Sequence, residues 1–274
     1  MGFLIPGSQV QFLPGAPNKR GDSMAGHSKW ANIKHKKAAS DAVKGKLFSK
    51  LAKEIVVAAR SGGGDPSANI TLRSFIQKAR AANMPSDNIE RAIKKGTGEL
   101  GGAAMEEIIY EGFAPGGVSL IVQALTDNRN RTAPEVRHVF TKHNGNLATQ
   151  GSVMRTFRRK GYILVSSALT NEDKLLEVVL DVGAEDVQQQ GDVFEILTEP
   201  TQLAVVCDAL TMAGIKIENS EITLFPDIEI PIKDKEQAAH ILKFIEDLED
   251  LDDVQNVYAN CDIDETILEA GSKG

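Results

Sequence analysis

The sequence predicts an α+β protein in which a small helical bundle precedes a longer region of alternating strands and helices. Its 274 residues are enough for two ordinary domains or three small ones. The hydrophobic periodicity is helical up to residue 96 and changes after a Gly-rich linker at 97–104. A composition of 42% hydrophobic and 25% charged residues is typical of a soluble globular protein and excludes collagen-like and wholly disordered chains.

Three short amphipathic helices are predicted before the linker. The first lies between Ser40 and Ser61, with an apolar face made of Leu47, Phe48, Leu51, Ile55, Ala58 and Ala59. Its opposite face is basic and consists of Lys46, Lys50, Lys53 and Arg60. A second helix fits the apolar positions from Leu72 to Ala82, and a third fits Ile89, Ala92 and Ile93, with Gly96 as its C-cap.

Strands and helices alternate in the rest of the chain. Strands are predicted at 105–113 and 117–126, followed by a helix at 132–143. The middle set, 158–227, is a β-α-β-α-β unit with its helices on one face, predicted as strands 161–166, 192–198 and 216–225 and helices 171–183 and 200–213. A last helix at 234–249 and strand at 254–261 could complete a second α+β unit with 105–157, although periodicity does not establish that pairing.

Residues 1–23 differ from everything that follows. They are rich in Gly and Pro, show no helical or strand period, and cannot form a signal peptide because Pro6 and Gly7 interrupt the only apolar start. Met24 opens a sequence of different character. We interpret 1–23 as an expression-derived or upstream-translated leader, with a natural disordered arm as the alternative.

The net charge of −7 conceals a strongly dipolar chain. Residues 24–96 carry 15 Lys and Arg against five acidic residues, a net charge of +10, whereas 97–274 have a net charge of −18. Such asymmetry predicts one end that faces a polyanion and another that is repulsive or faces protein.

Several function classes are disfavoured by composition and motifs. Two cysteines cannot form a disulfide scaffold or a four-cysteine zinc site, and no apolar run approaches the length of a membrane span. No Walker-type loop, G-x-S-x-G elbow or H-E-x-x-H signature occurs. We therefore predict no enzymatic activity, no cofactor and no metal, with a metal-dependent nuclease using His138 and His143 as a minor alternative.

The first candidate interface is the basic N-terminal module. Clustered cations neutralise phosphates, and an aromatic ring among them can stack on a base. The candidates are Lys29, Trp30, Lys34, His35, Lys36 and Lys37, together with the helical positions Lys46, Lys50, Lys53 and Arg60. The alternatives are a solvated basic face and, for Trp30, an anchor that docks the arm on the bundle.

Two further basic segments are weaker candidates. Arg129 and Arg131 lie in a loop after the strand 117–126, with Arg137 in the next helix. Thr132 would cap that helix, and these arginines could instead pair with nearby acids. A third patch contains Arg155, Arg158, Arg159 and Lys160 and could equally be a solvated strand end.

The acidic stretch 247–253 (DLEDLDD) has no glycine-centred alternation of ligands, so it does not predict a calcium loop. We interpret it as a solvated face, or as a patch that repels nucleic acid and directs the basic end toward it.

Several long motifs resemble the YebC/PmpR family, which includes the mitochondrial translational activator of cytochrome c oxidase subunit I. The resemblance begins with MAGHSKWANIKHKK at 24–37 and continues with MPSDNIERAIKKG at 84–96. It extends through YEGFAPGG at 110–117, LTDNRNRT at 125–132 and GSV at 151–153. These motifs are ordered and specific, and they leave only residues 1–23 outside the resemblance.

The resemblance implies an N-terminal helical bundle and two ferredoxin-like α+β domains, the third domain being inserted in the second. The domains would be 24–98, then 99–157 with 228–274, and the inserted 158–227. Members are described as DNA-binding transcriptional regulators, and others are similar to ribosome-associated translation factors. The Met24 start lacks mitochondrial transit features, which favours a bacterial cytoplasmic member.

The sequence therefore predicts a non-enzymatic nucleic-acid-binding regulator without a membrane partner. A DNA-binding transcriptional regulator is the first hypothesis. The alternatives are a ribosome-associated factor that binds rRNA or tRNA and assists elongation, and a protein-interaction scaffold using the acidic 228–274 portion. The oligomeric state is not predicted.

Overall fold

The helical domain contains, in its described residues, the helices α2 (Asp41–Gly62), α3 (Ile70–Ala81) and α4 (Ser86–Gly96). The computed structural model describes residues 41–101 and 104–263. Asn69 joins the first two helices. Its side-chain oxygen accepts a hydrogen bond from the Leu72 amide at 3.0 Å and so caps α3, and its side-chain nitrogen donates to the Ala58 carbonyl of α2 at 2.8 Å. The core of this domain comes from all three helices and includes Ile55, Val56, Leu72, Ile76, Ala79, Met84, Ile89 and Ala92. All three predicted helices are confirmed.

Gly96 has a different role from the predicted cap. It lies in the last turn of α4, and Thr97 is the C-cap. A Cβ at Gly96 would lie 2.6 Å from the carbonyl oxygen of Val56 and 2.7 Å from Cβ of Ala59. The glycine is therefore required by the close approach of α4 to α2 rather than by helix termination.

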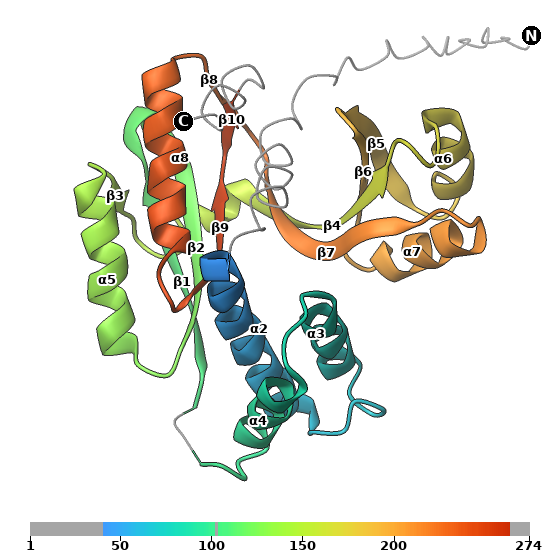
Figure 1. The fold of residues 1–274 in the computed structure, drawn as a ribbon. Coiled ribbons are helices and arrows are strands. Elements are labelled where there is room, and N and C mark those ends of the chain that lie inside the picture. Colours follow the sequence, from blue (N-terminus) through green and yellow to red (C-terminus); the bar gives the residue numbers. More distant parts are fainter. Residues whose placement is uncertain (1–40, 102–103, 264–274) are drawn as a thin grey trace, which may run out of the picture.

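The second domain is a four-stranded antiparallel sheet with two helices on one face (Figure 1). It contains β1 (Glu106–Phe113), β2 (Ser119–Thr126), α5 (Arg129–Lys142), β3 (Asn146–Leu147), α8 (Lys235–Glu249) and β9 (Val254–Ala259). The strand order is β3-β1-β2-β9, and β9 pairs with β2 in a register that sets Ile121 opposite Tyr258. A short parallel pair, β8 (Ile230–Ile232) and β10 (Cys261–Ile263), completes it.

The third domain is inserted in the sequence of the second, between β3 and β8. It contains β4 (Phe157–Ser166), α6 (Glu172–Val179), β5 (Ala184–Gln190), β6 (Val193–Thr198), α7 (Leu203–Met212) and β7 (Ile217–Pro226). Its antiparallel sheet has the order β5-β6-β4-β7, which is the ferredoxin-like arrangement. On one face, Leu175 of α6 and Leu210 of α7 share a hydrophobic core with Ile163 and Ile196 of the sheet. The predicted α+β class, with one α+β domain inserted in another, is confirmed.

Three details of the predicted third domain are wrong. The helix expected at 171–183 ends at Val179, and β5 follows it. The prediction lacks β5 because this is an edge strand whose sequence, AEDVQQQ, carries too few apolar residues to show a strand pattern. β4 starts at Phe157 rather than 161, so Arg158, Arg159 and Lys160 belong to a strand.

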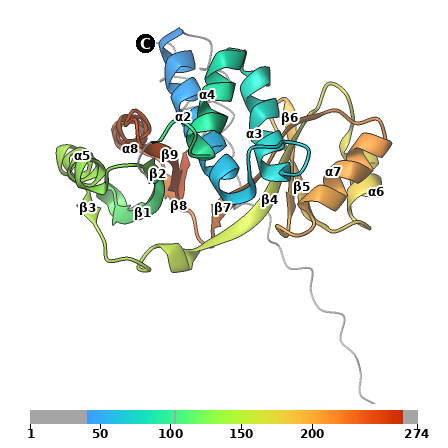
Figure 2. The same cartoon turned by 90° about the horizontal axis from the view of Figure 1, so that it is seen from below.

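The helical domain contacts the second domain at the turn between the C-terminal end of α8 and the start of β9. Figure 1 and Figure 2 show α2 reaching the turn between α8 and β9, and α3 on the side of the inserted domain. The second and third domains share a small hydrophobic cluster of Ile121, Val153 and Phe157. No helix of the described chain is long and apolar enough to cross a bilayer.

Candidate nucleic-acid interface

The lysines predicted to face a nucleic acid along α2 contact the second domain instead. Lys46 Nζ lies 2.7 Å from Asp250 Oδ1, and Lys50 Nζ donates to the backbone oxygen of Glu249 at 3.2 Å. Lys53 Nζ donates to the backbone oxygen of Asp252 at 2.6 Å and to Asp253 Oδ1 at 2.7 Å. These acceptors belong to residues 249–253, which we call the acidic turn. The lysine face thus forms an interdomain contact, and its binding to a nucleic acid stays a prediction.

The acidic turn likewise has a different role from those predicted. It is neither a purely solvated face nor a patch that only repels polyanions, because it accepts hydrogen bonds from α2. Just before it, Asp247 contacts Lys142 at 2.6 Å and His143 at 2.9 Å. His143 also stacks on Phe244 with 4.9 Å between ring centroids, so this histidine has a packing role.

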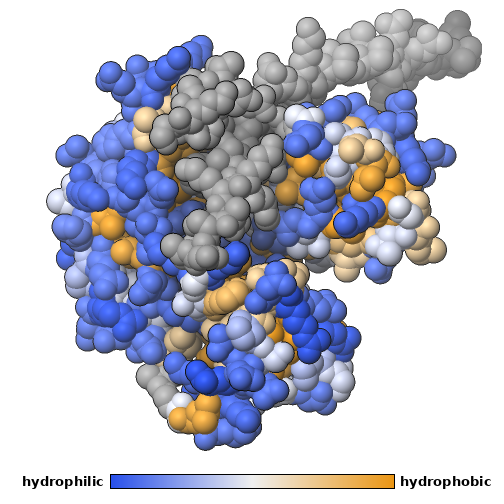
Figure 3. Space-filling view, viewed as in Figure 1, coloured by the Kyte–Doolittle hydropathy of each residue, from blue (hydrophilic) through white to orange (hydrophobic). Residues whose placement is uncertain are grey.

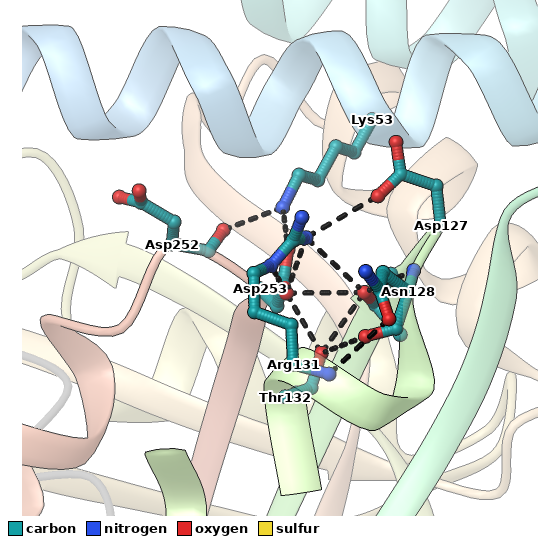
Figure 4. Close-up of polar contacts among 8 residues, drawn as sticks. Lys53, Asp127, Asn128, Arg131, Thr132, Asp252 and Asp253 are labelled. Carbon is teal, nitrogen blue, oxygen red and sulfur yellow. Dashed lines mark hydrogen bonds and ion pairs between the residues drawn. The ribbon is translucent and has the colours of Figure 1, made fainter. Parts of the chain in front are cut away.

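Asp253 is the central acceptor of the interdomain contact (Figure 4). Only 2% of its side chain is exposed. Besides Lys53, the carboxylate lies 2.7 Å from Arg131 Nη2, 2.7 Å from Thr132 Oγ1 and 3.0 Å from Thr126 Oγ1. Burial by itself would raise the pKa of Asp253, but the hydrogen bonds from Lys53, Arg131 and Thr132 outweigh it and hold the pKa well below its ordinary value. The group is therefore a buried anion held by charged donors.

The first turn of α5 supplies two of those donors, Arg131 and Thr132. Asn128, not Thr132, is the N-cap of α5, and its side chain accepts from the Arg131 amide at 3.2 Å. The predicted cap is wrong because the helix begins three residues earlier than expected. Thr132 is buried and directs its hydroxyl at Asp253.

Two arginines that the sequence placed in a loop lie in the first turn of α5 and contact acids, as the alternative interpretation proposed. Arg131 binds Asp253 and also Asp127 at 3.2 Å, and Arg129 Nη1 lies 3.5 Å from Glu106 Oε1. Arg137 is exposed on α5 and forms no ion pair with another described residue. Of the three, Arg137 is the one without an ion pair to a described residue, whereas the side chains of Arg129 and Arg131 are paired and still 66% and 46% exposed.

The third basic patch is largely paired within the inserted domain and its borders. Arg158 contacts Asp227 at 2.5 Å, and Lys160 contacts Glu185 at 2.8 Å and Glu199 at 2.5 Å. Arg155 and Arg159 are exposed. The patch thus resembles a solvated strand end with local ion pairs.

A different group of bases makes no ion pair within the described chain. Arg91, Lys94 and Lys95 lie within about one turn of α4, and we call them the α4 basic turn. Arg91 and Lys94 are exposed, and Lys95 is half-buried. Arg60 follows Ala59, the residue against which Gly96 of α4 packs, and is exposed at the end of α2. The sequence-based candidates include Arg60 but not the α4 residues, although the +10 charge of their segment was the signal that could have identified them.

The α4 basic turn borders an interdomain cleft of about 810 Å³. Arg91 and Lys95 line it from the helical domain, and Asp250 and Asp252 of the acidic turn line it from the second domain. Apolar side chains also contribute, namely Phe48, Met84 and Met105. The cations of the helical domain thus face a second-domain wall that carries several acids and Arg131.

Other predicted site residues are not placed by the structure. Lys29, Trp30, Lys34, His35, Lys36 and Lys37 lie outside the described residues. Within the part of the chain that is described, no group of three or more His, Cys, Asp or Glu side chains could hold a metal ion.

Comparison with known proteins follows the same division into domains. A family model described as "TACO1/YebC protein N-terminal domain" matches residues 28–99, and one described as "TACO1/YebC second and third domain" matches residues 105–261. The chain belongs to the TACO1/YebC family. The resemblance found in the sequence motifs is therefore confirmed.

Relatives within the TACO1/YebC family match nearly their whole length. A "Probable transcriptional regulatory protein" of Aquifex aeolicus is 55% identical over 246 residues, which is 90% of this chain and 99% of the relative. One of the same description from Desulfatibacillum aliphaticivorans is 52% identical over 240 residues, covering 88% and 97%. A crystal structure of a conserved hypothetical protein from Aquifex aeolicus matches with a TM-score of 0.78 and 54% identity, over 86% of this chain and 98% of that one. Both curated relatives are thus described as probable transcriptional regulators.

Proposed function

We propose that this TACO1/YebC member is a non-enzymatic regulator that binds nucleic acid through its helical domain. The observation that carries the proposal is the α4 basic turn, three neighbouring bases without ion pairs to described residues, in a segment with a net charge of +10. Phosphate contacts of this kind give affinity without reading sequence. Arg60 and Arg137 are further exposed contributors, and the basic arm with Lys29, Trp30, Lys34, His35, Lys36 and Lys37 extends the same charge.

Lysine and arginine side chains on a helix surface would contact DNA and RNA phosphates alike. The relatives are described as probable transcriptional regulatory proteins, which favours transcriptional control and hence DNA as the target. Location in a bacterial cytoplasm stays a prediction from the sequence. Binding to ribosomal RNA or tRNA during translation is the second candidate, because phosphate contacts by lysine and arginine do not by themselves select DNA over structured RNA.

The scaffold alternative has a separate structural basis. Figure 3 shows hydrophobic surface gathered over the inserted domain, where Leu169, Leu180, Val205 and Met212 are exposed, the last at 89%. This surface lies in 158–227 rather than in the acidic 228–274 portion. Exposed apolar patches of this kind are common at protein interfaces.

The test is the salt dependence of binding by a variant that lacks the three positive charges of the α4 basic turn. We expect R91Q/K94Q/K95Q to weaken binding to duplex DNA or to an RNA hairpin. The slope of log affinity against log salt should fall by up to about 0.9 for each phosphate that the variant no longer neutralises. R155Q/R159Q/K216Q is the matched control, because it removes the same charge from exposed positions on the inserted domain and its border. Equal weakening by both variants would contradict a binding surface on α4.

DNA and RNA targets are separated by crosslinking in cells followed by sequencing of both nucleic acids. Enrichment of promoter DNA without ribosomal reads would exclude the translation hypothesis. Enrichment of ribosomal RNA or tRNA without promoters would exclude the transcription hypothesis.

A further inference from the structure

The acidic turn presents to α2 the kind of oxygens that a nucleic-acid backbone would present. Lys46 meets a carboxylate, Lys50 a backbone carbonyl, and Lys53 both, all at 2.6–3.2 Å. Anionic and carbonyl oxygens in a row along a lysine face are the ligands that phosphate groups would replace. We infer that the acidic turn is an intramolecular competitor of nucleic acid, which covers the lysine face of α2 until the helical domain separates from it.

This regulatory contact rests on the proposed function, and it requires that the helical domain can move. Every buried residue of the helical core comes from α2, α3, α4 or the turn between the last two. The core of the second domain is a separate cluster built from its own strands, α5 and α8. Between them the chain passes through Gly98 and Gly101, both with positive φ. Separation would therefore leave each core with its own helices or strands, and Met105, just before β1, is the residue beyond the linker that packs against the helical core.

The contact itself is of a type that ions can weaken. Lys46 and Asp250 remain 45% and 56% exposed, and exposed ion pairs are screened by salt. The Lys53–Asp253 pair is more buried and forms the inner part of the contact. Opening would thus begin at the Lys46 end, where solvent and ligands have access.

A polyanion has a route to this contact. The cleft that is lined by Arg91 and Lys95 is also lined by Asp250 and Asp252. A nucleic acid held by the α4 basic turn would therefore compete with the acidic turn at the same opening. Its phosphates would repel Asp250 and attract Lys46, which favours the separated arrangement.

The experiment compares two variants of equal charge in the full-length chain, by fluorescence anisotropy with a short duplex DNA and an RNA hairpin. D250N/D252N removes two negative charges from the acidic turn, including the partner of Lys46. D173N/D181N removes two negative charges from exposed positions on the inserted domain. At low salt we expect D250N/D252N to bind about two- to fivefold more tightly than D173N/D181N, the value of an exposed ion pair. The gain should disappear when K46Q/K50Q is added, because the uncovered lysines are then absent.

Two results would overturn the inference. One is equal affinity of D250N/D252N and D173N/D181N, which would mean that only overall charge matters. The other is a gain that persists with K46Q/K50Q, which would place the freed contact elsewhere. If no chain binds either nucleic acid, the proposed function fails. The movement is then tested separately by small-angle scattering: a radius of gyration that rises with salt in the wild type indicates opening, and an unchanged one contradicts it.

Discussion

Lys53 and Asp253 lie 200 residues apart in the sequence, yet their side chains meet at 2.7 Å and join the helical domain to the second domain. The same carboxylate receives Arg131 and Thr132 from the start of α5. Three segments of the chain thus depend on one buried anion. Such an anion is stabilising only while its charged donors remain in place.

Replacing Asp253 by Asn should therefore destabilise the protein. The amide keeps the shape of the carboxylate but removes the charge that Lys53 and Arg131 face. We expect the free energy of unfolding to fall by about 2–3 kcal/mol, the usual value of hydrogen bonds to charged groups. Urea denaturation measures it. Asp250→Asn is the control, because its side chain is 56% exposed, and it should change stability by no more than about 0.5 kcal/mol.

The depressed pKa of Asp253 predicts a dependence of stability on acid. Burial acts to raise this pKa, but the hydrogen bonds from Lys53, Arg131 and Thr132 prevail, so the native pKa lies below the ordinary 3.8. Between those two values the unfolded chain binds a proton that the native chain does not. The stabilisation is fully present above about pH 4 and is lost as pH falls toward the native pKa.

Urea denaturation at several acidic pH values checks this dependence. D253N should lose stability less steeply than the wild type. Some slope should remain, since hydrogen bonds from Lys142 and His143 also lower the pKa of Asp247 against the opposing effect of burial. Parallel slopes for wild type and D253N would show that Asp253 does not titrate as inferred.

The helices of the first domain and most strands could be predicted from the sequence, because hydrophobic periodicity is local information. The role of the lysine face of α2 could not. The amphipathic pattern correctly opposes Lys46 and Lys53 to the core, but the partners of Lys53 lie 199 and 200 residues away and carry no periodic signal. Asp253 is one acid in an acidic run, and only the pairing of β9 with β2 brings it to Thr126.

A second buried carboxylate, Glu111 of β1, holds the loop after β3. It accepts from the backbone amides of Gly151, Val153 and Met154 at 2.5–2.8 Å. Glu111→Gln replaces one acceptor oxygen by a donor and should cost about 1–3 kcal/mol, because at least one buried amide loses its partner. In this variant the backbone amides of residues 151–154 should also exchange hydrogen faster than in the wild type. Glu107→Gln, an exposed change on the same strand, is the control and should leave that exchange unchanged.

Gly96 tests the packing of α4 on α2, which positions the α4 basic turn. A methyl group there would lie 2.6 Å from the Val56 carbonyl oxygen, a backbone atom that cannot rotate away. Gly96→Ala should therefore push the helices apart and destabilise the domain by about 1–3 kcal/mol, despite the better helix propensity of alanine. Thermal unfolding measures the effect.

Gly45 of α2 provides the matched control, because a Cβ there would meet nothing within 4 Å. Gly45→Ala keeps only the propensity effect and should stabilise α2 by up to about 1 kcal/mol. Opposite signs for the two alanine substitutions would establish that the glycine in α4 serves close helix packing. If Gly96→Ala also stabilised the protein, α4 could shift without cost, and the fixed position of Arg91, Lys94 and Lys95 beside the cleft would have to be abandoned.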